Sequence, residues 1–351
     1  MWPNNRLTEL LGLTWPILQS PMGGVATPKL AAAVSNFGAL GGLGMWGLSV
    51  DEVRRTILRF RQLSQGPLNV NYPIWKDPGD IDGLGIKMRE RLQCLYHEKG
   101  AGLLPEPKTY SSAVSDEHLS TLEEMKPEVV SFHFGLPERR VIETLKGIGV
   151  LIICSATTVN EARILLDSGV DAIIAQGTEG GGHRGSFTGT DVSVQPGLFS
   201  LLPQVVDAVD VPVIAAGGIV DGRGIAAALM LGASGVQIGT AFLRCEEAHV
   251  SDDYRTALSM ARDEDTVITD VVSGRPARFI KNRLIDSLSG ETALPFPAQG
   301  TLTGPLESHG DHELMGFYAG QSVGLTRNMD AGRLVKTLVQ EAADCLKACS
   351  C

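Results

Sequence analysis

One histidine lies at the end of an apolar stretch. His133 stands between two phenylalanines in "VVSFHFGLP", Val129 to Pro137. Because imidazole changes its charge near neutral pH, His133 has the chemistry to donate, accept or transfer a proton. A histidine inside an apolar strand is also frequently a hydrogen-bonded core residue. Its position in the fold decides between these two interpretations.

Three glycine-rich turns carry a second kind of chemistry. They are "QGTEGGGHRG" from Gln176 to Gly185, the pair Gly217-Gly218, and "QIGT" from Gln237 to Thr240. Main-chain N–H groups in such turns can cradle a phosphate. None of the turns has the lysine of a nucleoside-triphosphate loop. They predict a phosphate-bearing ligand of another kind, although a tight strand–helix turn also needs glycine.

Uncharged amide side chains accompany these turns. Asn71, Gln176 and Gln237 each lie at or near the end of an apolar run. An amide both donates and accepts hydrogen bonds, which suits the edge of a flavin pyrimidine ring. Together with the glycine turns, the amides predict a planar cofactor that carries phosphate.

The elements that must position these residues repeat along the chain. Apolar runs, continuous rather than alternating, alternate with helix-like segments, two of which have predicted N-caps at Thr27 and Ser49. This pattern predicts an α/β protein, a (β/α)8 TIM barrel, in which the carboxyl ends of all strands share one rim. An open doubly wound sheet is the main alternative, but it usually has GxGxxG after its first strand. The predicted strands cover residues 16–22, 38–44, 67–73, 128–134, 149–156, 170–177, 211–218 and 234–241.

Two regions interrupt this alternation. Residues 244–316 are polar and then rich in proline and glycine, which predicts an inserted lid or substrate subdomain after the eighth strand. The barrel would then consist of residues 1–243 and 317–351, with a last helix near residues 330–347. Residues 74–125 are long for one strand-to-strand connection, so we expect extra loop and helix at one end of the barrel.

Composition excludes several classes of partner. A net charge of −10 argues against nucleic acid. We find no apolar segment of membrane-spanning length. The six cysteines lack zinc-ribbon spacing and predict reduced thiols in a cytoplasmic protein. His309 and His312 have a short chelating spacing, but they lie in a polar stretch and we expect no metal site.

Several stretches resemble the nitronate monooxygenase family, formerly called 2-nitropropane dioxygenases. They are "PILQSPMGGVATPKLAAAVSNFGALGGLG", "VVSFHFGLP", "DAIIAQGTEGGGHRGSF" and "VPVIAAGGIVDGRGIAAALMLGASGVQIGTAFL", and they extend over most of the chain. The resemblance implies a TIM barrel that binds FMN. By the same resemblance, the flavin contacts are Met22, Gly23, Gly24, Asn71, Gln176, Gly181, Gly218, Gln237, Ile238, Gly239 and Thr240, with Gly217 as a neighbour.

The resemblance also implies an activity. Family members oxidise alkyl nitronates with O2 to a carbonyl compound and nitrite, and propionate 3-nitronate is one candidate substrate. His133 matches the catalytic histidine of class I members, and "HFG" is generally missing from the related flavin enoyl-[acyl-carrier-protein] reductases and NADH:quinone reductases. An NAD(P)H-dependent flavin reductase of those types is therefore the alternative. We expect a monomer or a homodimer.

A substrate pocket is expected over the flavin. Its candidates are Tyr110, His183, Phe296 and Tyr318; members of the family often carry Tyr at the position of Phe296 and Trp at that of Tyr318. His183 either contacts flavin or substrate or braces its loop. The basic residues Arg275, Arg278, Lys281 and Arg283 either steer an anion or form a solvated face of the lid.

Overall fold

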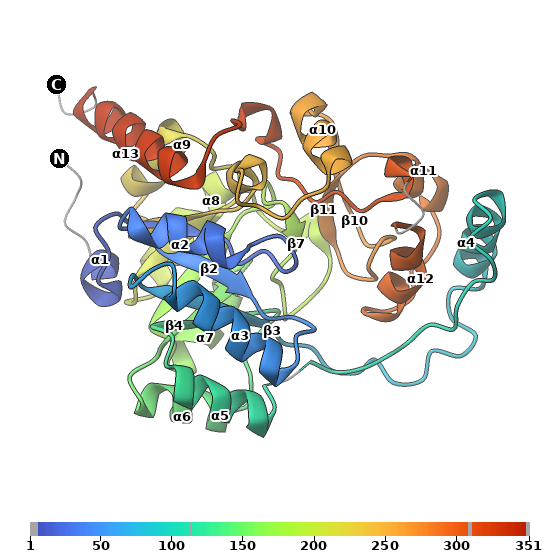
Figure 1. Ribbon diagram of the computed structural model, residues 1–351, viewed down its shortest axis with the longest axis horizontal. Helices are drawn as coiled ribbons and strands as arrows, with labels where there is room; N and C mark the ends of the chain where they lie inside the picture. The colour runs from blue at the N-terminus through green and yellow to red at the C-terminus, as the bar shows by residue number, and fades with distance from the viewer. Residues whose placement is uncertain (1–5, 113, 308–310, 349–351) are drawn as a thin grey trace.

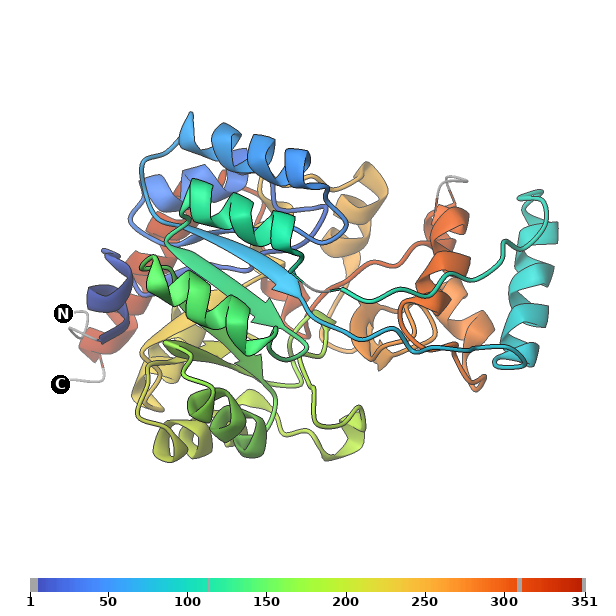
Figure 2. The same ribbon diagram turned by 90° about the horizontal axis from the view of Figure 1, so that it is seen from below.

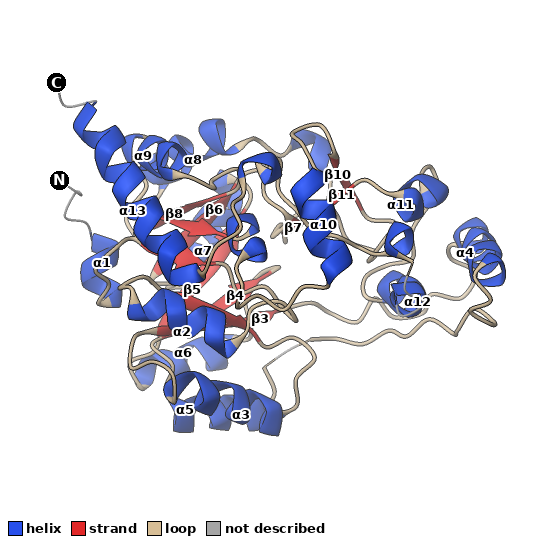
Figure 3. Cartoon of the chain, turned by 45° about the horizontal axis from the view of Figure 1, so that its top comes forward, coloured by secondary structure: helices blue, strands red, loops and turns tan. Residues whose placement is uncertain are grey.

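The computed structural model describes residues 6–112, 114–307 and 311–348. Eight parallel strands form one sheet in the order β1-β9-β8-β6-β5-β4-β3-β2. A parallel bridge between Leu18 and Leu40 joins β1 to the β2 side, so the sheet curves into a nearly closed barrel (Figure 3). The predicted TIM barrel is thus confirmed.

Each barrel strand lies inside one of the predicted apolar runs. Hydrophobic side chains fill the barrel interior, where Leu18, Ile153 and Ile174 meet Leu7 and Leu11 from the N-terminal helix at the amino end of the strands. The strands are β1 Ile17–Gln19, β2 Gly41–Gly44, β3 Leu68–Pro73, β4 Val129–His133, β5 Leu151–Ala156, β6 Ala172–Gln176, β8 Val213–Ala216 and β9 Gly235–Ile238.

Helices surround the barrel (Figure 1). Thr27 caps α2 and Ser49 forms a capping box with Glu52 on α3, as the sequence predicts. The helices that follow successive strands are α2 Pro28–Asn36, α3 Val50–Arg61, α5 Asp116–Met125, α6 Arg139–Gly147, α7 Val159–Asp167, α8 Leu198–Ala208, α9 Gly222–Met230 and α13 Ala331–Ala348, and α1 Arg6–Leu11 precedes β1.

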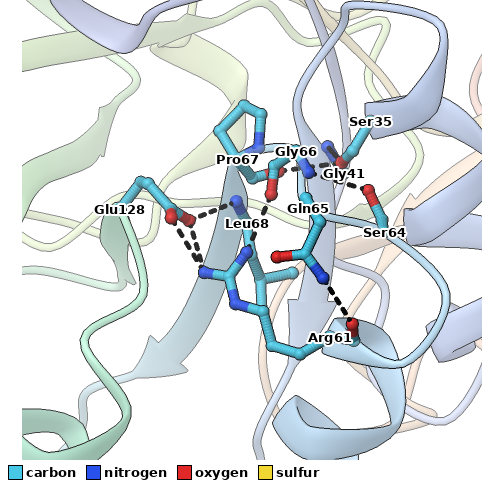
Figure 4. Close-up of polar contacts among 9 residues, drawn as sticks. All are labelled: Ser35, Gly41, Arg61, Ser64, Gln65, Gly66, Pro67, Leu68 and Glu128. Atoms are coloured by element: carbon cyan, nitrogen blue, oxygen red, sulfur yellow. Dashed lines mark hydrogen bonds and ion pairs between the residues drawn. The ribbon is translucent and has the colours of Figure 1, made fainter.

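A polar network joins the amino ends of β2, β3 and β4 (Figure 4). Arg61 donates to both carboxylate oxygens of Glu128, at 2.9 and 2.7 Å, and Glu128 accepts from the N–H of Leu68 at 2.8 Å. Ser35 accepts from the N–H of Gly41 and donates to the carbonyl of Pro67. These contacts stabilise the barrel end that lies away from the glycine-rich turns.

A second layer projects from the other end of the barrel (Figure 2). It has its own hydrophobic core, in which Met88, Leu92 and Tyr96 pack against residues between Val271 and Leu314. The extra helix predicted for residues 74–125 therefore belongs to the same layer as the 244–316 segment. Its elements are α4 Ile86–Glu98, β7 Gly182–His183, β10 Thr266–Thr269, β11 Ala277–Ile280, α11 Arg283–Leu288 and α12 Ala298–Glu307, with α10 Asp252–Met260 nearer the barrel. Short 3-10 turns occur at Val192–Val194, Thr240–Arg244, His312–Leu314 and Val323–Leu325.

Among the described residues, no helix is both long enough and apolar enough to cross a membrane.

Candidate active site

A cavity of about 290 Å³ opens at the carboxyl ends of the barrel strands. Its volume lies near the lower end of the ~300–1,000 Å³ typical of small-molecule pockets. Most of the predicted site residues line it, and three do not: Gly24, Ile238 and Tyr110. Those that line the cavity are Met22, Gly23, Asn71, His133, Gln176, Gly181, His183, Gly217, Gly218, Gln237, Gly239, Thr240, Phe296 and Tyr318.

One side of the cavity carries unused hydrogen-bonding groups. No described residue accepts a hydrogen bond from the main-chain N–H of Gly218, Gly239 or Thr240. The buried Oε1 of Gln237 also has no partner among the described residues. Because buried polar groups are rarely left unpaired, this side is built to bind something polar. The carboxylate of Asp221 already caps the N-terminus of α9. A bound anion is therefore favoured at the glycine-rich turns and not at that helix end.

The other two amides are already bonded within the protein. Asn71 donates to the carbonyl oxygen and the hydroxyl of Ser131, at 3.1 and 2.9 Å. Gln176 donates to the carbonyl of His183 and accepts from the N–H of Gly185. These bonds fix the orientation of both side chains at the cavity wall.

His133 uses both ring nitrogens. Its Nδ1 lies 2.9 Å from the hydroxyl of Ser155, and its Nε2 lies 3.2 Å from the carbonyl oxygen of His183. Burial lowers the pKa of His133 from 6.5 to about 4, against the opposing effect of the His183 carbonyl. The ring is therefore neutral near pH 7.

His183 lies against the same cavity. Its Nε2 is 2.9 Å from the hydroxyl of Ser273, and its ring packs 5.4 Å from that of Tyr318 and 5.6 Å from that of Phe296. Burial, followed by the charges of His133 and Arg275, lowers its pKa to about 3. The site thus contains two neutral imidazoles.

Two neutral histidines make stability depend on pH. Their folded-state pKa values, about 4 and about 3, lie below the ordinary 6.5, so the unfolded chain binds protons first as the pH falls. We expect the free energy of unfolding to drop by roughly 1–2 kcal/mol per histidine between pH 7 and pH 5. Urea unfolding at both pH values measures it, with His183→Gln as the comparison. If the free energy of unfolding fell equally in His183→Gln and in the wild type, His183 would not be buried as a neutral imidazole.

Comparison with known proteins identifies the family. The family model for nitronate monooxygenase matches residues 4–341. A probable nitronate monooxygenase of Staphylococcus aureus (strain Newman) is 37% identical over 352 residues, which cover 97% of this chain and 98% of that protein. The chain belongs to the nitronate monooxygenase family. It is therefore an oxidoreductase, as the sequence predicts.

Two solved structures resemble this chain along nearly its whole length. A nitroalkane oxidase from Streptomyces ansochromogenes matches with a TM-score of 0.88 at 37% identity, covering 97% of this chain and 99% of that one. FabK from Thermotoga maritima matches with a TM-score of 0.75 at 28% identity, covering 99% of both chains. The nitronate monooxygenase family is flavin-dependent and acts on small molecules.

In this family member, aromatic rings form the wall beside His133. The ring of Phe134 lies 4.6 Å from that of His133, and Trp75 lies 4.9 Å from Phe296. Phe134 has a φ of +70°, a conformation that costs a non-glycine residue free energy and turns its ring toward the cavity. Tyr110 stands behind this wall, 5.7 Å from Trp75. Sequence reasoning did not place Trp75, Phe134 or Ser155 at the site.

The basic residues of the second layer divide into two groups. Arg278 is buried and donates to the carbonyl of Thr178. Arg275 donates to the carbonyl of Ser186 and lies 3.9 Å above the ring of Phe134. Neither belongs to a solvated face, whereas Lys281 is exposed and Arg283 pairs with Glu98 on the outside. Arg275 and Arg278 do not line the cavity.

No metal cluster is found in the part of the chain that the structure describes. There, no group of three or more His, Cys, Asp or Glu side chains could hold an ion. His312 is exposed, and His309 lies outside the described residues.

Proposed function

We propose that the protein is an FMN-dependent nitronate monooxygenase that converts small anionic nitronates and O2 into a carbonyl compound and nitrite. One observation carries the proposal: a neutral histidine shares a cavity with a rim of unpaired main-chain N–H groups. The rim suits a phosphate, and the histidine suits an anion beside the cofactor.

FMN fits the polar side of the cavity. The N–H groups of Gly218, Gly239 and Thr240 are free for its phosphate, and Gln237 offers an unpaired acceptor to a ring N–H. A Cβ built on Gly23 or Gly24 would meet nothing within 4 Å, so there is room beside Met22. Asn71, Gln176, Gly181, Gly217 and Ile238 complete the proposed binding set. We also propose that residues 244–316 form the substrate subdomain, which contributes Phe296.

The orphaned acceptor of Gln237 gives a direct test of the cofactor. Replacing Gln237 by leucine removes a hydrogen bond to the flavin and is expected to weaken flavin binding roughly tenfold, since one such bond contributes about 1 kcal/mol or more. Titration of flavin-free protein with FMN, followed by quenching of flavin fluorescence, measures the dissociation constant. Gln204→Leu, on the exposed surface of α8, is the matched control. Equal affinity in Gln237→Leu and wild type would contradict the proposed contact.

When bound, FMN would supply the electron-transfer and oxygen chemistry of the reaction. The chain binds and orients the anion. The Nε2–H of His133 then donates to a nitronate oxygen instead of to the carbonyl of His183. That carbonyl still accepts a hydrogen bond from the side chain of Gln176, so it is not left unpaired. A charge-assisted hydrogen bond is stronger than the neutral bond that it replaces. The rings of Phe134, Trp75 and Phe296 keep water from the reacting carbon.

An aerobic nitrite assay tests the function. The FMN-loaded protein is mixed with alkyl nitronates and with propionate 3-nitronate, and nitrite and the carbonyl product are measured together. Release of both in equal amounts is expected. Absence of nitrite from every nitronate, with FMN bound, would exclude the proposed function.

A further inference from the structure

Ser155 and His133 lie side by side on neighbouring strands. Phe132 of β4 pairs with Cys154 of β5, so the next residues, His133 and Ser155, stand at the same level of the barrel. Ser155 is 5% exposed and its hydroxyl lies 2.9 Å from Nδ1. Gly185 covers the pair: a Cβ there would be 2.7 Å from Cε1 of His133 and 3.0 Å from Cβ of Ser155. Two strands and a close backbone thus hold this contact in place.

The hydrogen bonds of His133 determine where its proton is. The carbonyl of His183 can only accept, so its contact favours a hydrogen on Nε2 of His133. In a neutral ring Nδ1 then holds the lone pair, and the Ser155 hydroxyl donates to it. The partner of His183 differs, because the Ser273 hydroxyl already donates to the carbonyl of Arg275 and is left to accept from Nε2 of His183.

The charges around His133 favour the neutral ring. Arg275 lies over Phe134, and Arg184 donates to the carbonyls of Gln176 and Gly177. After burial itself, both guanidinium groups oppose a second proton on His133, whereas the hydrogen bond to the His183 carbonyl favours one. The carboxylate of Glu161 acts in the other direction, but five hydrogen bonds from Thr157, Phe187 and Thr188 already hold it.

We propose that Ser155 is a positioning residue that, together with the His183 carbonyl, holds His133 as the Nε2–H tautomer, so that a nitronate oxygen that takes the place of that carbonyl meets a proton donor and not a lone pair. A lone pair at the same place would repel the anion. The role rests on the proposed function, because it concerns the binding of a nitronate. The tautomer itself is a property of the protein and is measured without substrate.

Nitrogen-15 NMR of the FMN-bound protein, labelled at histidine, tests the tautomer. In the wild type, the His133 signals, assigned with His133→Asn, are expected to show protonated Nε2 and unprotonated Nδ1 at pH 7. Ser155→Ala is expected to move both signals toward a mixture of tautomers, and Ser155→Thr, which keeps the hydroxyl, is expected to restore the wild-type pattern. Protonated Nδ1 in the wild type, or an unchanged pattern in Ser155→Ala, would overturn the proposal.

Steady-state kinetics with a preformed nitronate test whether Ser155 contributes to substrate binding. Ser155→Ala with full FMN occupancy is expected to raise KM about fivefold, which corresponds to about 1 kcal/mol of lost hydrogen-bond orientation, and Ser155→Thr is expected to recover most of it. Unchanged KM in Ser155→Ala would overturn the positioning role. If the wild type itself releases no nitrite, the proposed function has failed, and the NMR result still decides the tautomer.

Discussion

Replacing His133 by asparagine is expected to lower kcat/KM for nitronate oxidation at least about 100-fold while FMN stays bound. The loss follows because the Nε2–H of His133 is the donor that we propose for the nitronate oxygen, and removing one preorganised donor to a developing or bound anion typically costs 10²–10³. Asparagine is too short to place an N–H where Nε2 lies. His133→Gln reaches that position, and we expect it to recover part of the activity.

Steady-state nitrite release, normalised to bound flavin, measures both variants. The visible flavin spectrum and its stoichiometry verify that the cavity is intact. The proposed role of His133 would be wrong if the asparagine variant, with flavin bound, kept wild-type kcat/KM.

Replacing Glu161 by alanine is expected to destabilise the protein by about 3 kcal/mol or more. Glu161 is fully buried. Its carboxylate accepts from the N–H and hydroxyl of Thr157 and of Thr188 and from the N–H of Phe187. Without it, buried N–H groups lose their partner, at about 1–3 kcal/mol each. The same change releases the segment after His183 from α7, so flavin binding should weaken as well.

Urea unfolding at pH 7 measures this effect. Glu161→Gln keeps an acceptor oxygen and is expected to lose less than Glu161→Ala. Glu143→Ala is the matched control, since Glu143 forms an exposed ion pair with Arg139 on α6 and such pairs contribute about 0–1 kcal/mol. Similar free energies of unfolding for Glu161→Ala and Glu143→Ala would show that the hydrogen bonds to the buried Glu161 carboxylate do not stabilise the fold.

Much of the barrel could be predicted because its signals are local. Strands buried on both faces leave continuous apolar runs, and the caps at Thr27 and Ser49 mark where helices begin. Parallel strands bring their carboxyl ends to one rim, so residues as distant as Met22, His133 and Gln237 could be expected on one cavity.

The second layer could not be predicted in the same way. Its core joins Met88 and Leu92 to Phe279 and Leu302, which lie about 200 residues away in the sequence, and nothing local indicates that pairing. Arg275 and Arg278 look like a solvated basic stretch because only the folded chain supplies the carbonyls of Ser186 and Thr178 to which they donate. The Ser155–His133 contact likewise depends on strand register.

Anaerobic mixing of the FMN-bound protein with a nitronate tests the central claim most directly. The account predicts that the nitronate reduces the flavin, seen as a change in its visible absorbance spectrum, and that air restores the oxidised spectrum with release of nitrite. NADH in a parallel sample is expected to react little. Rapid bleaching by NADH together with no reaction of the nitronate would contradict the account and favour an NAD(P)H-dependent flavin reductase.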